Sequence, residues 1–168
     1  MTRCFARYAR SFSVIAFISA TSFLFGFVFS TANLASASPD PGSTACTLLT
    51  PADIAKATGL KVDNGTAGPP IPGVLGKCTW TGSGNRVIVT LSDAQHMQIT
   101  IEATEKSGGT DVPGLGSKAV GTKAAAFTGG GYIVSVIDTK GGFGVSTLGN
   151  EGGRDRAIAL AKIVESRR

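Results

Sequence analysis

The chain has 168 residues and a formal net charge of +5, from 16 basic and 11 acidic residues. Three of the arginines lie among the first ten residues, so the remainder carries 13 basic against 11 acidic residues and is close to neutral. These basic residues are scattered and lack the interleaved aromatics of a nucleic-acid-binding stripe, which excludes that class of protein. The single histidine, His96, argues against transition-metal sites and histidine-assisted nucleophiles, since both usually need a histidine with further ligands or partners.

The first 37 residues have the three zones of an export signal. Arg3, Arg7 and Arg10 form a basic region, residues 12–29 form an apolar run, and residues 35–37 read Ala-Ser-Ala. We therefore predict a signal peptide cleaved after Ala37, with a periplasmic or secreted product. The alternative is an uncleaved membrane anchor, because an apolar run of about 18 residues is near the lower limit for crossing a bilayer.

Two cysteines remain in the predicted exported part of the chain. Cys4 belongs to the leader, whereas Cys46 and Cys78 form an even count in an oxidising compartment. In the chain-entropy model, a disulfide between them would stabilise the folded state by about 3.5 kcal/mol, because it closes a loop in the unfolded chain. A stabilisation of this size favours a structural role over a redox role. Residues 38–44, rich in Ser, Pro and Gly, are predicted to be a disordered spacer before a single domain at residues 45–168.

The domain opens with the signature of a helix start. Thr50 is the predicted N-cap, Pro51 occupies the first helical position, Asp53 adds an acid to the first turn, and Gly59 ends the helix. The apolar residues predicted for the core around this helix are Leu48, Leu49 and Ile54.

A β-hairpin is predicted after a loop. Residues 63–76 contain so many glycines and prolines that regular structure is not expected there. Residues 77–81 and 86–91 alternate like strands around a Gly-Ser-Gly-Asn turn. Cys78 and Trp80 stand two residues apart and so share one face, which places the only tryptophan against the disulfide as core packing.

The middle of the chain fits two patterns. Residues 93–107 alternate like a strand, but they also carry a cap, an apolar face and a stop for a helix; the alternation favours the strand. Glycine-rich turns then separate the predicted strands 118–127, 132–138 and 143–148, which is typical of an antiparallel meander. Residues 154–167 repeat apolar side chains at helical spacing.

Together these elements predict an α+β domain. Its antiparallel sheet has about five strands and is covered on one face by a short N-terminal helix and a C-terminal helix. Residues 93–106 add either a middle helix or a further strand.

Three segments carry a resemblance to a known family. They are residues 45–55 (Ala-Cys-Thr-Leu-Leu-Thr-Pro-Ala-Asp-Ile-Ala), 78–80 (Cys-Thr-Trp) and 112–119 (Val-Pro-Gly-Leu-Gly-Ser-Lys-Ala). In this order they resemble a family of small bacterial secreted or lipoprotein domains of unknown function. The resemblance implies a paired Cys46 and Cys78, an α+β fold and a helix over residues 93–106. Family members often carry an acid after the Gly-x-Gly turn, where this chain has Ser117 and Lys118.

Two motifs with functional precedents have simpler interpretations. Residues 114–119 fit the phosphate-binding pattern Gly-x-Gly-x-x-Ala, but a strand-like run follows where a helix is required. His96 is interpreted as an exposed residue without a catalytic role. We predict no cofactor and no metal site.

The function predicted from the sequence is an exported, non-enzymatic binding module with an unidentified partner, such as an envelope protein. Recognition is expected through residues 63–76, residues 108–116 or an open sheet edge, and membrane contact only through an uncleaved leader. One alternative is a small apolar-ligand carrier, with a cavity between sheet and helices. The other is a hydrolase that uses the carboxylates of Asp93, Glu102, Glu105 and Asp111.

Overall fold

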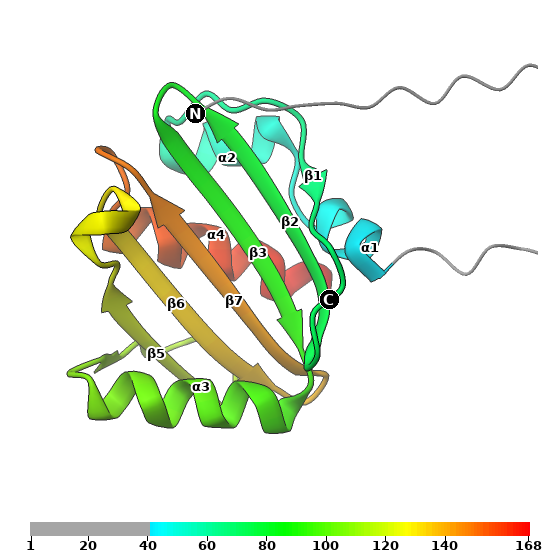
Figure 1. Ribbon diagram of the computed structural model, residues 1–168, viewed down its shortest axis with the longest axis vertical. Helices are drawn as coiled ribbons and strands as arrows, with labels where there is room; N and C mark the ends of the chain where they lie inside the picture. Colours follow the sequence, from blue (N-terminus) through cyan, green and yellow to red (C-terminus); the bar gives the residue numbers. More distant parts are fainter. Residues whose placement is uncertain (1–40) are drawn as a thin grey trace, which may run out of the picture. The chain divides into compact units, whose positions relative to one another are not determined.

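The computed structural model describes residues 41–168, which form one antiparallel sheet of seven strands and four α-helices. Figure 1 shows this arrangement. The predicted signal peptide, its apolar run and residues 38–40 lie outside the described residues. The α+β class predicted from the sequence is confirmed. Among the described residues every helix is too short or too polar to span a bilayer.

The sheet has the order β1-β2-β3-β7-β6-β5-β4, and every neighbouring pair is antiparallel. The strands are β1 (Thr66–Ala67), β2 (Val74–Gly82), β3 (Asn85–Ser92), β4 (Thr110–Asp111), β5 (Lys118–Lys123), β6 (Gly131–Asp138) and β7 (Gly141–Leu148). Ser83 and Gly84 form the turn between β2 and β3, both with positive φ.

The sheet exceeds the predicted five strands because two short strands lie at its edges. β1 lies within residues 63–76 and β4 within residues 108–116, the loops in which no strand was expected. Each is only two residues long and has no alternating pattern of its own. They form because the neighbouring strands β2 and β5 offer unpaired backbone groups for them to bond.

The helices are α1 (Pro41–Thr47), α2 (Pro51–Thr58), α3 (Ala94–Lys106) and α4 (Arg154–Arg167), with a 3-10 turn η1 (Ala126–Thr128). The first helix takes in residues 41–44, which are therefore helical rather than the disordered spacer that was predicted. The second begins as predicted: the Thr50 hydroxyl accepts from the Asp53 amide, and Gly59 ends the helix in the left-handed conformation.

Residues 94–106 form the helix α3, the alternative implied by the resemblance, and the strand favoured by the alternation alone is wrong. The Asp93 carboxylate accepts a hydrogen bond of 2.7 Å from the His96 amide and caps the helix. Met97 and Ile101, four residues apart, are buried, whereas Ile99 is 61% exposed. This burial pattern follows the helical period rather than the strand period.

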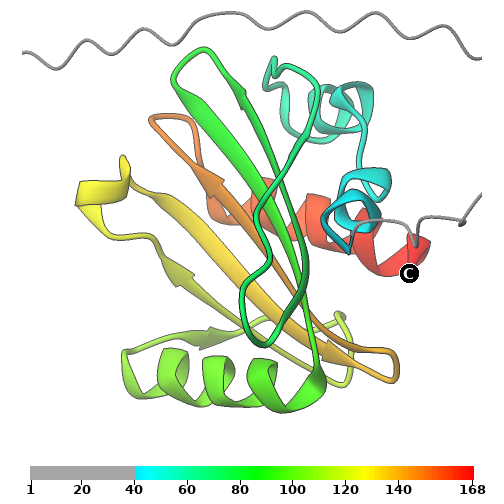
Figure 2. The ribbon, with the colours of Figure 1, turned by 45° about the vertical axis from the view of Figure 1, so that its right-hand side comes forward.

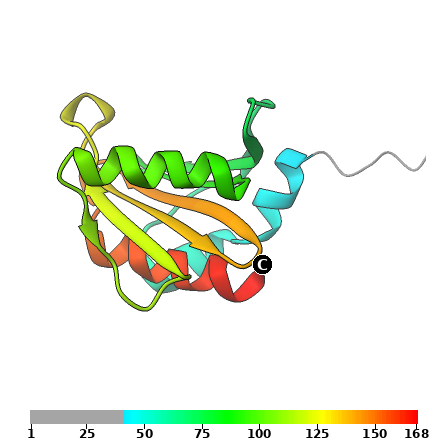
Figure 3. The same cartoon turned by 90° about the horizontal axis from the view of Figure 1, so that it is seen from below.

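Helices cover both faces of the sheet, which corrects the prediction of one covered face. Seen from below in Figure 3, α3 lies on one side of the sheet and α4 on the other. On the α4 side, α2 packs against α4, and the main hydrophobic core lies between these helices and the sheet. On the other side α3 packs mainly against β5, β6 and β7, over a small cluster of Met97, Ile101, Val120 and Ile137.

The disulfide joins Cys46 in α1 to Cys78 in β2, as predicted, with 5.0 Å between the Cα atoms. Trp80 is 1% exposed and belongs to the same core as Cys78. Both border Gly65, where a Cβ would lie 2.6 Å from Cys78 Sγ and 2.7 Å from the Trp80 ring. The other predicted core residues are also buried: Leu48 (6% exposed), Leu49 (1%) and Ile54 (0%).

Candidate functional site

Part of the sheet face on the α3 side has no helix over it. In Figure 1, α3 crosses one end of the sheet, and the remaining length of β2, β3 and β7 lies in front of α4 without a covering element. We call this surface the open face. Strand alternation and register assign to it Thr79, Thr81, Arg86, Ile88, Thr90, Ile133, Gly144, Ser146 and Leu148.

We call the strip of the open face along β7, from Gly144 to Leu148, the β7 groove; its two ends line the two cavities described below. Its floor is Gly144 and Ser146 of β7, which have no side chain or a short one. The register places Ile88 and Ile133 on either side of Ser146, and Thr90 beside Gly144. Ser146 is therefore flanked by larger side chains from both neighbouring strands, whereas Gly144 lies between Thr90 and the short Ser135.

At the α3 end the groove leads into a cavity of about 200 Å³. Ser92 lines this cavity and is 1% exposed, and its Oγ has no hydrogen-bond partner among the described residues. A buried hydroxyl without a partner is unusual, because it loses its bonds to water without replacement. The other residues that line the cavity are Thr90, His96, Met97, Thr100, Ile133, Ser135, Gly144 and Ser146.

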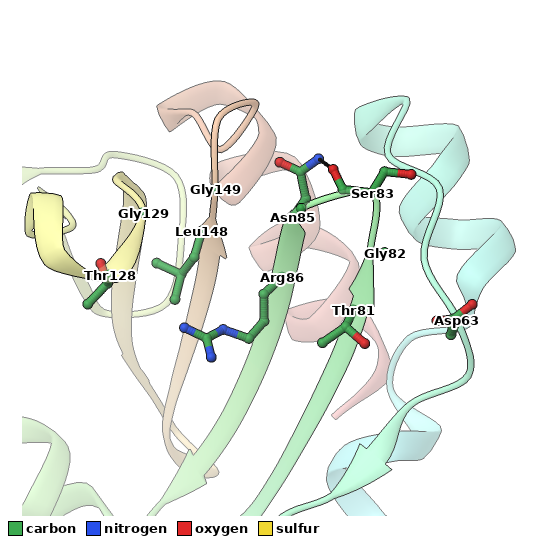
Figure 4. A pocket seen from close by; sticks show the side chains of 11 residues that line it. Asp63, Thr81, Gly82, Ser83, Asn85, Arg86, Thr128, Gly129, Leu148 and Gly149 are labelled. Atoms are coloured by element: carbon green, nitrogen blue, oxygen red, sulfur yellow. Dashed lines mark hydrogen bonds between the residues drawn. The ribbon is translucent and has the colours of Figure 1, made fainter.

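At the opposite end lies a cavity of about 470 Å³, which Figure 4 shows from close by. Arg86 extends across it from β3 toward Leu148 of β7. One wall is held by the buried Asn85, whose side-chain amide donates to the Ser83 carbonyl at 3.1 Å and accepts from the Glu151 amide at 3.1 Å. Other lining residues are Asp63, Thr81, Gly82, Gly84, Thr128, Gly129 and Gly149.

Arg86 is the arginine of residues 41–168 that makes no ion pair. The others, Arg154, Arg156, Arg167 and Arg168, each have a carboxylate oxygen within 3.8 Å. Arg86 is exposed and faces a cavity that contains one acidic residue, Asp63. Its guanidinium therefore has its donors free for a ligand.

The rim of this cavity carries an unusually exposed aromatic residue. Phe127, in η1, is 92% exposed, and the next two residues, Thr128 and Gly129, line the cavity. Figure 3 shows η1 projecting from the same side of the sheet as α3. A large apolar side chain in this position is typical of an interaction surface.

The loop over residues 63–76 is held along β2. The Asp63 amide donates to Thr81 O at 2.8 Å, and the Gly68 amide to Lys77 O at 2.9 Å. In Figure 2 the segment continues beside β2 toward α3. There a Cβ on Gly73 would overlap the His96 ring, so the loop also contacts α3.

The loop over residues 108–116 is held at its Gly-x-Gly turn. The Gly116 amide donates to Glu165 Oε1 of α4 at 2.5 Å, and the Val112 amide to Ala119 O at 2.9 Å. Val112 and Leu115 are buried. Because a carboxylate of the protein itself occupies an amide of the turn, the position is unsuited to a phosphate.

The four carboxylates suggested for hydrolysis are not brought together around one cavity. Asp93 caps α3, Glu102 accepts from Gln98 at 2.8 Å, and Glu105 pairs with Lys118 at 2.7 Å. Asp111 lies in β4. Within residues 41–168 no group of three or more His, Cys, Asp or Glu side chains could hold a metal ion.

The strongest shift in acidity belongs to a structural ion pair. Arg167 of α4 donates two hydrogen bonds to the Asp53 carboxylate of α2, at 2.7 and 2.8 Å. These bonds, with those from Thr50, hold the pKa of Asp53 well below its usual range. The pair lies on the face opposite the open face and joins two helices.

Comparisons with protein-family models, with curated proteins and with solved structures find no match for the chain. The site must therefore be judged from its own geometry. Sequence reasoning placed recognition in the loops and did not identify Arg86, Ser92 or Phe127. The signal available was the second face of the strands, where Ile88 stands between Arg86 and Thr90, and Ile133 is followed by Ser135.

Proposed function

We propose that this chain is an exported, non-enzymatic binding module that holds a protein partner on its open face. The observation that carries the proposal is the open face itself, with the cavity of Arg86 at one end, the cavity above the buried Ser92 hydroxyl at the other and the exposed Phe127 on the rim. Free hydrogen-bonding groups beside exposed apolar side chains are the composition that protein interfaces use.

The engagement of the acidic groups supports a binding role over hydrolysis. A glycosidase-type mechanism needs two carboxyl groups facing one another across a cleft. Here Asp93 caps a helix and Glu105 is paired with Lys118, so both have structural partners. These contacts favour a surface role for the acidic segment.

The packing of the interior supports a binding module over the second alternative, a carrier of apolar ligands. Between the sheet and α4 the core contains Trp80, Phe143 and Leu160, each 1% exposed or less. Filled space of this kind leaves the open face as the accessible surface for a ligand.

The proposal includes export of the chain and its membership of the family of small bacterial secreted or lipoprotein domains. The leader, the resemblance to small bacterial secreted or lipoprotein domains, and the disulfide between Cys46 and Cys78 support a periplasmic or secreted location. The disulfide by itself is compatible with such a location.

Site-specific photo-crosslinking tests the proposal. The full chain, with its leader, is produced in its native host with a photoreactive phenylalanine at Phe127 or, as a control, at the exposed Ala52 of α2. We expect a discrete protein adduct from position 127 and none from position 52. Equal adducts from both positions, or none from 127, would contradict the proposal.

The adduct is then identified and the binding measured with purified proteins. Phe127→Ser should weaken binding at least about tenfold, a size typical of an interface anchor. Lys162→Ser, on the exposed surface of α4, should leave binding unchanged. Because Phe127 is 92% exposed, its replacement should not alter the unfolding midpoint.

A further inference from the structure

The β7 groove has the length of a short extended peptide. Arg86 and Ser92 both lie on β3 and on the same side of the sheet, six residues apart. At about 3.3 Å per residue this separation is about 20 Å, which an extended segment of about six residues spans. A partner lying along the groove would therefore contact Arg86 at one end and the mouth of the cavity above the buried Ser92 at the other.

The surface of the groove suits a peptide backbone. Gly144 and Ser146 leave room above β7, and Ile88 and Ile133 provide apolar contact on both sides. The unpartnered Ser92 Oγ supplies a hydrogen-bonding group at the α3 end, beneath the surface of the groove. Apolar walls with a few fixed polar groups are the usual composition of a peptide or ligand site.

The charge at the other end selects the chemical group. A guanidinium binds a carboxylate through two parallel hydrogen bonds, and Arg86 makes no ion pair among the described residues. Arg86 and Asp63 are the charged residues that line this cavity, so its formal charge is balanced, and Arg86 can neutralise at most one negative charge of a ligand.

The sheet edges direct the partner to the face. β1 and the bonds from Asp63 and Gly68 cover the outer side of β2, and β4 covers that of β5. The outer edges of the sheet are then β1 and β4, each only two residues long, and short edge strands offer few backbone groups to a partner strand. This favours the face over the edges as the binding surface.

We propose that the β7 groove binds an extended C-terminal segment of a partner protein, with the terminal carboxylate held by Arg86. This inference rests on the proposed function of the open face and adds the chemistry of the partner.

The test uses a library of random peptides, about seven residues long, displayed with free C-termini and selected on the purified domain. An enriched peptide is synthesised as the acid and as the C-terminal amide, and both affinities are measured by calorimetry. We expect the acid to bind at least about tenfold more tightly than the amide, a difference in the range of charge-assisted hydrogen bonds.

Three variants locate the peptide. Arg86→Gln should remove the difference between acid and amide, whereas Lys123→Gln, an equal charge change at the end of β5, should preserve it. Gly144→Val should block both peptides by filling the floor of the groove. A Cβ there meets its nearest atom, Val134 O, at 3.7 Å, so the variant should fold, and circular dichroism with Gly144→Ala as a second variant checks this.

The outcomes separate this inference from the proposed function. The inference is overturned if no peptide is enriched, if acid and amide bind alike, or if inorganic phosphate displaces the peptide better than acetate does. If position 127 still yields its specific adduct in those cases, the open face remains the binding surface and only the carboxylate assignment is lost. If that adduct is also absent, both proposals fail.

Discussion

Two glycines of β7 provide a matched test of where α3 lies. Gly142 and Gly144 stand two residues apart and face the same side of the sheet. Around Gly142 an added Cβ would overlap the Cβ and Cγ of Met97 in α3. Around Gly144, beyond α3, the nearest atom is Val134 O at 3.7 Å. The same substitution to alanine therefore meets a helix at one position and open space at the other.

The expected magnitudes follow from these contacts. Gly142→Ala must displace a Cβ that is fixed to the backbone of α3, and overpacking of this kind costs about 1 to 3 kcal/mol. Gly144→Ala should be neutral or gain about 0.5 kcal/mol, because alanine restricts the unfolded chain more than glycine does. Urea unfolding followed by circular dichroism should separate the two midpoints by about 1 M.

A double-mutant cycle assigns the effect to the contact itself. Combining Gly142→Ala with Met97→Gly, which removes the overlapping Cβ, should cost less than the sum of the two single changes, because residues in contact are energetically coupled. Equal stability of the two glycine variants, or strict additivity with Met97→Gly, would refute the placement of α3 over Gly142.

The remaining predictions concern the disulfide and an ion pair. Replacing Cys46 and Cys78 together by alanine should lower the free energy of unfolding by about 3.5 kcal/mol and abolish the response of stability to reductant, measured by urea unfolding with and without a phosphine; unchanged stability would mean that the bridge does not constrain the unfolded chain. Asp53→Asn should cost about 1 kcal/mol at neutral pH, the scale of a partly exposed ion pair with an N-terminal helix cap. Because pairing with Arg167 lowers the pKa of Asp53, that contribution is present above the unfolded value of about 3.9 and is lost as the pH falls below it. The stability difference between wild type and variant should therefore shrink in acid, and a constant difference would contradict the pairing.

Local signals specified most of the individual elements. Thr50 and Gly59 mark the ends of α2 because capping depends on residues within one helical turn. The hairpin of β2 and β3 forms around the glycine-containing turn at residues 83–84 for the same reason. The helix α4 occupies the predicted residues 154–167.

The misread elements are those whose state depends on distant residues. The segment of α3 alternates in sequence, and it is helical because Met97 and Ile101 bury against Val120 and Ile137 of the sheet. The strands β1 and β4 form only because β2 and β5 are there to pair with them. In each case tertiary contacts decided between local alternatives.

The candidate site was beyond sequence reasoning for a related reason. Arg86 and Ser92 are ordinary residues of a strand. Their significance depends on what residues 41–168 do not supply, which is a carboxylate for Arg86 and a hydrogen-bond partner for Ser92. The loops predicted for recognition are instead pinned by backbone hydrogen bonds to β2 and by Glu165.

By itself the amino-acid sequence determined the helix caps, the turns and the alternating strands, because these depend on neighbours along the chain. It also determined the cysteine pair, because only two cysteines lie beyond the predicted leader. Only the tertiary structure decided that α3 crosses to the face opposite α4 and covers part of it. The physical reason is that close packing of a helix on a sheet requires matching surfaces from remote segments, here the missing side chain of Gly142 beneath Met97. Beyond Gly142, at Gly144, α3 no longer covers β7, and this is where the open face begins.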